Sequence, residues 1–267
     1  MRSIWLALLL AIAPIERALP WGSEGHSIVA EIAQRRLSPA ASQKVREILK
    51  GNVSLASISS WADDVRAQRV KTTKEHFVDI PLSASNYDPA RDCTDTPKGD
   101  CIINAIERNK QTLADPNAAA LQRQEALMFL VHFIGDIHQP LHTVDDFVGG
   151  NTFPVSFFVD PGKHRVEATN LHVVWDTGVI QATSWAWGSY LTRAEAWLAG
   201  KDITALSAGS PEEWALAAHK DAVDVAFTIQ QNEQLSEDYL KRAQQVVDRQ
   251  LALAGVRLAR VLNEILQ

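Results

Sequence analysis

Two histidine–aspartate pairs with the same spacing are the residues of this sequence best suited to chemistry. His132 and Asp136 lie four residues apart, and so do His172 and Asp176. On a helix, residues four apart lie one turn above each other on the same face. One such pair is more often a core histidine bonded to a neighbouring aspartate, but two pairs with one spacing favour a metal site. Imidazole and carboxylate are ligands that zinc accepts in a near-tetrahedral array.

The first pair lies in a longer motif that adds another candidate ligand. Residues 132–142 read His-Phe-Ile-Gly-Asp-Ile-His-Gln-Pro-Leu-His and follow an apolar run at 126–131. Proline cannot continue a helix, so the chain must turn at Pro140 and present His142 from a different direction. Two imidazoles and a carboxylate can therefore converge here. Three other histidines show no ligand pattern, and we expect surface or supporting positions for them: His138, His164 and His219.

The elements that must position these residues are mostly helices. Apolar residues at helical spacing, with serine and proline start signals, predict helices in several segments: 26–37, 39–49, 58–66, 101–114, 118–139, 189–199, 211–229 and 236–265. Residues 75–81 look extended, residues 83–100 look like a loop, and turn signals with alternating apolar residues predict a small hairpin within 147–169. Because no repeat or linker interrupts the pattern, we expect one mainly α domain.

Length, charge and cysteine content limit the function classes. A chain of 267 residues can bury a large core as one big or two small domains. Its formal net charge of −6 makes a broad basic surface for duplex nucleic acid a poor expectation. Its two cysteines, Cys93 and Cys101, lack metal-site spacing; in an exported chain we expect them to pair, the alternative being two free buried thiols.

Residues 1–20 differ from the rest of the chain. Arg2 precedes an apolar run at 4–13 that is too short to span a membrane comfortably, which is typical of an export signal. Ala18 suits cleavage before Trp21, although Pro20 is an unusual residue at that position. We therefore expect a mature domain of residues 21–267 that is secreted or periplasmic and makes no stable membrane association.

Several short motifs together resemble a known family. In chain order they are Trp-Gly-x-x-Gly-His at 21–26, Trp-Ala-Asp-x-x-Arg at 61–66, His-Phe at 76–77, the motif at 132–142, Gly-Gly-Asn at 149–151 and Asn-Leu-His-x-x-Trp-Asp at 170–176. This order resembles the zinc-dependent single-strand nucleases of the mung-bean-nuclease type, also called the S1/P1 family, across essentially the whole mature chain. The resemblance implies a mainly α fold, shared with zinc-dependent phospholipases C, and a cluster of three zinc ions.

The resemblance also implies which residues hold each ion. The first zinc is expected on Asp63, His76, His132 and Asp136. The second is expected on His142, His172 and Asp176. The third is expected on His26, on the amino group and carbonyl of Trp21, and on Asp136, which bridges to the first. Three divalent cations and three aspartates would leave a net positive cleft in an acidic protein, so phosphate would be drawn to the metals.

The implied activity is hydrolysis of phosphodiester bonds in single-stranded RNA and DNA, leaving 5′-phosphate ends, with 3′-nucleotidase activity as an open addition. Metal-activated water would attack phosphorus. Asp63, Arg66 and Asn170 are the expected catalytic residues, the last two bracing the phosphate; for Arg66 a solvated helix charge is the alternative. Phe77 and Val148 would form a slot for an unstacked base, although core packing is nearly as good an interpretation of Val148.

Two other functions remain open on the same ligands. A zinc-dependent phospholipase C would use the same fold and metals on a lipid. A periplasmic zinc-binding or storage protein would use the metals without a reaction. The Phe77 slot and the Gly-Gly-Asn motif favour nucleic acid or nucleotides as the substrate, acted on by a monomer.

Overall fold

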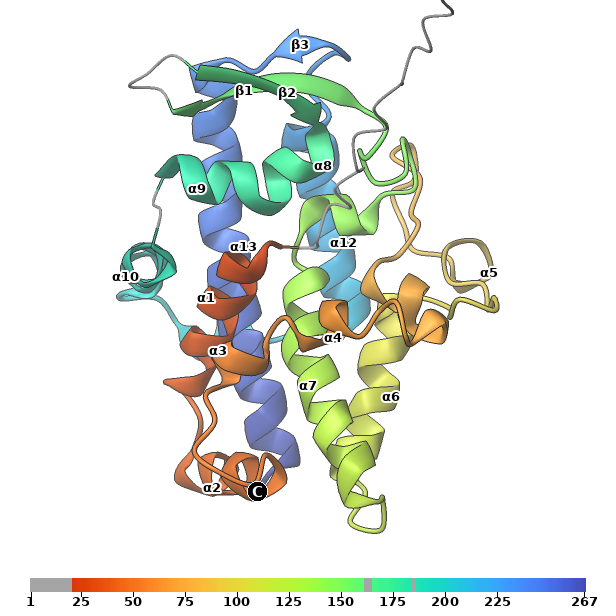
Figure 1. Ribbon diagram of the computed structural model, residues 1–267, viewed down its shortest axis with the longest axis vertical. Coiled ribbons are helices and arrows are strands. Elements are labelled where there is room, and N and C mark those ends of the chain that lie inside the picture. Colours follow the sequence, from red (N-terminus) through yellow and green to blue (C-terminus); the bar gives the residue numbers. More distant parts are fainter. Residues whose placement is uncertain (1–20, 161–164, 184–185) are drawn as a thin grey trace, which may run out of the picture.

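The computed structural model describes residues 21–160, 165–183 and 186–267, so the expected export signal and His164 lie outside the described residues. Most of the described chain is helical, which confirms the mainly α prediction (Figure 1). The long helix α13 (Glu237–Ile265) runs along the molecule, and α1 (Ser23–Gln34) packs against it. Helices α6 (Ile102–Ala114) and α7 (Ala120–Asp136) pack against each other beside that pair.

The remaining elements are short. In chain order they are α2 (Pro39–Ile48), α3 (Leu55–Ile58), α4 (Trp61–Asp64), the 3-10 helix η1 (Val70–His76), α5 (Pro89–Asp92), the 3-10 helix η2 (Pro140–Thr143), β1 (Pro154–Asp160), β2 (Arg165–Asn170), α8 (Leu171–Val173), the π-helix η4 (Val174–Gly178), α9 (Val179–Thr183), α10 (Trp187–Leu198), α11 (Ile203–Ser207), α12 (Pro211–Asp221), the π-helix η5 (Ala222–Ala226) and β3 (Glu233–Gln234).

Close contact between α1 and α13 depends on one glycine. A Cβ atom at Gly255 would lie 2.4 Å from Cγ2 of Ile32, so only glycine allows the two helices to approach this closely. Ser236 begins α13 by accepting a hydrogen bond from the backbone N–H of Tyr239 at 3.2 Å, the usual role of serine before a helix. The buried face of α1 therefore packs directly against α13.

The small sheet lies at one end of α13 (Figure 1). β1 pairs antiparallel with β2 from Pro154 opposite Asn170 to Asp160 opposite Arg165, and this confirms the hairpin predicted within 147–169. β3 adds two residues parallel to β1 and was not predicted, because a strand of that length leaves no alternation to detect. β2 leads directly into α8, so the sheet delivers His172 to the interior.

Two helix predictions need correction. The helix expected over 118–139 is shorter, because the residue before a proline is disfavoured in helical geometry and Gln139 is extended with φ −83° and ψ 117°. The helix expected over 58–66 is two short helices, α3 and α4. The break falls at Ser59, whose hydroxyl donates to the carbonyl of Ala56 at 2.8 Å and whose own carbonyl is used by a histidine.

The predicted extended segment at 75–81 and the predicted 211–229 helix are also only partly right. Residues 70–76 form η1, and the extended backbone after it bonds singly to two different segments: Val78 N–H to the His142 carbonyl at 2.8 Å, and Phe77 carbonyl to Ile102 N–H at 3.0 Å. No β-ladder follows from such bonds. The later helix ends as α12 and continues only as the π-turn η5.

None of the helices within the described ranges is both long enough and apolar enough to cross a membrane.

Candidate metal centre

The last turn of α7 carries the central residues of the site. His132 and Asp136 are fully buried there, at the end of a helix whose residues 126–136 are buried on all sides. Other elements bring side chains to the same place: His26 from α1, Asp63 from α4, His76 from η1, His142 from η2, His172 from α8 and Asp176 from η4. The fold thus collects eight histidine and aspartate side chains from seven elements around one point in the interior.

The first group is spaced as the ligands of one metal ion. Zinc bonds of 2.0–2.1 Å in a tetrahedron place two ligand atoms about 3.3 Å apart. Nδ1 of His76 lies 3.0 Å from Asp136 Oδ2 and 3.2 Å from His132 Nε2. Asp63 places one oxygen 3.5 Å from His76 Nδ1 and the other 3.6 Å from His132 Nε2. These four side chains, the predicted first ligand set, therefore lie close together, and three of them, Asp63, His76 and His132, are within reach of one ion.

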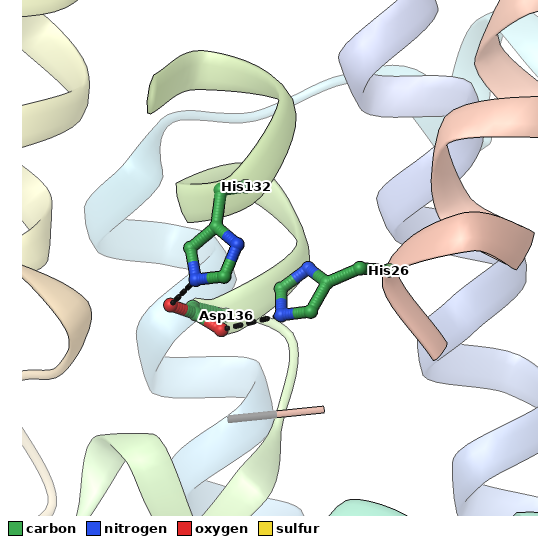
Figure 2. A group of neighbouring side chains, drawn as sticks. All are labelled: His26, His132 and Asp136. Atoms are coloured by element: carbon green, nitrogen blue, oxygen red, sulfur yellow. Dashed lines mark ion pairs between the residues drawn. The ribbon is translucent and has the colours of Figure 1, made fainter. Parts of the chain in front are cut away.

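Asp136 faces two histidines with its two oxygens (Figure 2). Oδ2 lies 3.0 Å from His132 Nε2, and Oδ1 lies 3.2 Å from His26 Nε2. The rings of His26 and His132 are stacked at 3.9 Å, and Gly135 makes room for them, because a Cβ there would lie 2.9 Å from His26 Nδ1. A carboxylate with this orientation can bridge two metal ions.

Trp21 is held beside this bridge. Its buried indole donates a hydrogen bond from Nε1 to the carbonyl of Gly135 at 2.9 Å, one residue before Asp136. The next residue, Gly22, donates its backbone N–H to the carbonyl of Asp176 at 3.1 Å. The chain at 21–22 therefore lies between the two segments that supply Asp136 and Asp176.

The second group contains His142, His172 and Asp176. Asp176 places Oδ2 3.2 Å from His172 Nε2 and Oδ1 3.8 Å from His142 Nε2. The two imidazole rings are stacked with centroids 5.1 Å apart. This set is more open than the first, with three side chains within reach of one ion.

Backbone carbonyls orient three of the imidazoles. Nδ1 of His132 lies 2.7 Å from the carbonyl of Ser59, Nδ1 of His142 lies 3.0 Å from that of His76, and Nδ1 of His172 lies 2.6 Å from that of Gly149. A carbonyl only accepts, so Nδ1 carries the proton and the lone pair of Nε2 points to the cluster. Such outer contacts are the usual support of a metal-binding histidine.

Gln139 is a supporting residue outside the predicted ligand set. Its side chain is fully buried, accepts from the backbone N–H of Leu141 at 2.5 Å and donates from Nε2 to Asp176 Oδ1 at 2.5 Å. The first bond fixes which end of the amide faces the carboxylate, and the second leaves Asp176 Oδ2 for a metal. A buried amide must find partners, so a glutamine inside a ligand motif was a usable signal.

The electrostatics of the first group suit a cation. Burial lowers the pKa of His76 and of His142 to about 3, so both are neutral at pH 7, the form that binds metal. Burial alone would lower the pKa of His132 as well, but the carboxylates of Asp136 and Asp63 outweigh it and raise that pKa to about 9. Burial raises the pKa of Asp63 to about 7. The raised pKa values of His132 and Asp63 mean that this group holds protons where a divalent cation would compensate the carboxylates better.

A cleft of about 460 Å³ opens beside the ligands His76, His142 and His172. Phe77 and Val148 line it, as the predicted base slot requires. Val148 is 66 % exposed, so the alternative that it packs in the core is wrong. A φ of 56° places Val148 in the left-handed region, within a turn that runs through Gly149 and Gly150 and leaves this side chain exposed.

The two residues expected to brace a phosphate differ in position. Arg66 lines the cleft, and its Nη2 donates to the carbonyl of Thr73 at 2.9 Å, so it is not the freely solvated helix charge of the alternative interpretation. Asn170 caps α8 by accepting from Val173 N–H at 2.9 Å and is not among the residues that line the cleft. Its Nδ2 amide remains as the end that could reach a substrate.

The disulfide and the other histidines are also placed. Cys93 and Cys101 form a disulfide with a Cα–Cα distance of 5.0 Å, which confirms the predicted pairing. His138 and His219 are buried rather than on the surface. Nη1 of Arg257 donates a hydrogen bond to Nε2 of His138 at 2.7 Å. Nε2 of His219 lies 3.1 Å from the carbonyl of Pro81.

Comparison with known proteins gives one consistent result. A sequence model of the family described as S1/P1 Nuclease matches residues 21–267. The chain is 34% identical to Nuclease P1 of Penicillium citrinum, over 92% of this chain and 97% of that protein. It is 32% identical to Endonuclease 2 of Arabidopsis thaliana, over 92% of this chain and 90% of that protein. It is 29% identical to Nuclease S1 of Aspergillus oryzae, over 97% and 96% of the two chains.

Proposed function

Because the chain belongs to the S1/P1 nuclease family and is a hydrolase of phosphodiester bonds, we propose that it is a zinc-dependent endonuclease of single-stranded RNA and DNA that leaves 5′-phosphate ends. The proposal depends on one observation, that two features of the site occur at the same cleft. Ligand atoms spaced for zinc lie at the wall of a cleft, and an aromatic side chain, Phe77, lines the same cleft.

The metal part of the proposal assigns three zinc ions to the clustered side chains. Asp63, His76, His132 and Asp136 would hold the first ion, and His142, His172 and Asp176 the second. The third would be held by His26, the second oxygen of Asp136, and the amino group and carbonyl of Trp21. Bound zinc would supply an activated water and positive charge for the leaving oxygen. The rest of the chemistry falls to the side chains of the chain itself.

Arg66 would stabilise the phosphate as negative charge builds on its oxygens. Its guanidinium is already fixed by the carbonyl of Thr73, so little reorganisation is needed when substrate binds. The amide of Asn170 would donate to the same group from the other side, two residues before the ligand His172. Asp63 would act as a ligand that keeps its ion next to this phosphate.

Phe77 and Val148 would select the substrate. A base that stacks on Phe77 must first leave its neighbours, which a single strand allows at less cost than a duplex. The protein has a net charge of −6, which gives it no broad means of binding a duplex backbone. Both features support a preference for single strands.

Export and removal of residues 1–20 belong to the same proposal. The family match begins at Trp21, the residue whose free amino group the third zinc would require. A peptide-bonded nitrogen is a planar amide with a delocalised lone pair and is a poor ligand. The mature protein would act as a monomer outside the cytoplasm.

One set of assays tests the proposal. Purified protein beginning at Trp21 is incubated with single-stranded DNA, RNA, a 3′-nucleotide and a choline phospholipid, each with and without a chelator. We expect cleavage of both nucleic acids, with 5′-phosphate ends, that stops with chelator and returns with zinc. Hydrolysis of the phospholipid alone would show a phospholipase C instead, and zinc binding without any hydrolysis would show a zinc-binding protein.

A further inference from the structure

The disulfide loop between Cys93 and Cys101 ends in a tightly built turn at residues 96–99. Thr96 and Gly99 exchange backbone hydrogen bonds at 3.0 and 3.1 Å, and the Thr96 hydroxyl donates to the Gly99 carbonyl at 2.7 Å. The same hydroxyl accepts from the backbone N–H of Lys98 at 3.1 Å. Gly99 has φ +102°, a conformation that favours glycine. Lys98 is therefore presented by a rigid turn.

This turn forms part of the cleft wall. The carbonyl of Lys98 accepts a hydrogen bond from the backbone N–H of Lys74 at 2.9 Å, in the segment that leads to Phe77. After the loop, Ile102 donates its N–H to the carbonyl of Phe77 at 3.0 Å. The second half of the loop is thus fixed to the Phe77 segment at two points, and Lys98 lines the same cleft as Phe77 and Arg66.

The charge of Lys98 is not compensated locally. Within the described ranges no carboxylate lies within ion-pair distance of its ammonium group, and the side chain is exposed. Its neighbours differ: Lys74 pairs with Asp79 at 3.2 Å, and Arg108 pairs with Glu75 and Asp100, each at 2.6 Å. In an acidic protein, the turn therefore brings an uncompensated cation to the wall of the cleft.

We propose that Lys98 binds a phosphate of the substrate strand next to the one that is cleaved. This subsite rests on the proposed nuclease function. The clustered metal ligands and Arg66 already account for the scissile phosphate, whereas Lys98 comes from a loop that contributes no ligand. The cleft volume of about 460 Å³ is within the range of sites that hold a whole small molecule, and so exceeds what a phosphate alone needs. The enzyme should thus favour strands over minimal substrates.

Substrate length provides the test. The zinc-loaded enzyme, Lys98→Ala and Lys98→Arg are compared on a dinucleotide without a terminal phosphate (a dinucleoside monophosphate), whose only phosphate is the scissile one, and on a longer thymidine oligonucleotide. We expect Lys98→Ala to lower kcat/KM on the oligonucleotide about two- to fivefold at low salt, the range for an exposed ion pair. Activity on the dinucleotide should not change. Lys98→Arg should retain the oligonucleotide rate, because the positive charge is kept.

Salt dependence adds a second readout. Loss of one phosphate contact should make the plot of log kcat/KM against log salt less steep by about 0.7 on the oligonucleotide, the value for single strands. Lys71→Ala is the matched control. Lys71 is also an exposed lysine close to the turn, but it lines a different hollow with Glu75 and Arg108. Its removal should leave both substrates and the salt dependence unchanged.

Other outcomes would overturn the subsite. An equal loss on dinucleotide and oligonucleotide would place Lys98 at the scissile phosphate, and no loss on either would show that it contacts no phosphate. An equal effect of Lys71→Ala would show only a general charge effect. A wild-type enzyme inactive on both substrates would instead refute the nuclease proposal on which the subsite rests.

Discussion

The metal-ligand cluster and the wall of the cleft are built in opposite ways. His132, Asp136 and His76 are fully buried, and the imidazole of His132 is fixed by the carbonyl of Ser59. Val148 and Lys98, in contrast, stand exposed on turns between regular elements. Buried groups with bonded neighbours hold the precise geometry that metal chemistry requires, whereas exposed loop residues can vary without loss of the fold. Side chains proposed to hold the metals and side chains proposed to contact the substrate line one cleft but differ in burial.

The largest effect is expected at Asp136, the buried residue predicted to bridge two zinc ions. Asp136→Asn removes a negative charge and one of the two oxygens that face His26 and His132. We expect loss of more than one zinc per chain and near-complete loss of hydrolysis, measured by metal analysis and by cleavage of single-stranded DNA. Asp64→Asn, at an exposed aspartate beside Asp63, is the control and should change neither. Three zincs and the wild-type rate in Asp136→Asn would disprove the bridge.

A smaller loss of zinc binding is expected from a change at Gln139, which contacts the predicted second-ion ligand Asp176. Gln139→Met keeps the approximate volume but removes the donor to Asp176 Oδ1. We expect zinc affinity at this ion to fall about 10- to 100-fold, the usual cost of losing an outer contact, while the first ion stays bound. Competition against a chelator of known affinity measures this. Gln250→Met is the control, because Gln250 is also buried and donates to an aspartate, Asp221, outside the ligand cluster. Equal zinc affinity in both variants would count against a positioning role for Gln139.

Changes at Phe77 in the cleft wall should alter the binding of single-stranded DNA but not the zinc content. Phe77→Ala should weaken binding of single-stranded DNA by about 1–3 kcal/mol, the contribution of one stacked base, with zinc content unchanged. Phe77→Trp keeps an aromatic face and should retain most of the affinity. Fluorescence anisotropy with a labelled oligonucleotide measures both variants. Loss of zinc in Phe77→Ala would show that Phe77 also supports the metal cluster. Equal cleavage of duplex and single strands by the native enzyme would contradict the proposed base slot.

Part of the site could be predicted from residue spacing alone, because its signals are local in sequence. The repeated four-residue spacing of His132 with Asp136 and of His172 with Asp176 survives in the structure as two close pairs, at 3.0 and 3.2 Å. Amphipathic spacing also predicted the long helices, and turn residues predicted the hairpin. In each case the interaction that fixes the conformation lies within a few residues of the pattern that reveals it.

The remainder depends on partners that are distant in sequence. The sequence gives His138 no ligand pattern, but it does not reveal that Arg257 of α13 lies against this histidine. Nothing near Ser59 indicates that its carbonyl orients His132, which is why one helix was predicted where two occur. The role of Gln139 likewise requires Asp176, 37 residues later in the chain.

Burial of the ligand cluster has a consequence for the folded state itself. Its side chains come from elements between α1 and η4, so an ion held there adds a direct link between segments that packing and hydrogen bonds already hold together. The unfolded chain cannot assemble these ligands, and bound metal therefore shifts the folding equilibrium by mass action. A free zinc concentration 100 times the dissociation constant would add about 2.7 kcal/mol per site. The lifetime of the folded protein would then depend on how much zinc its surroundings supply.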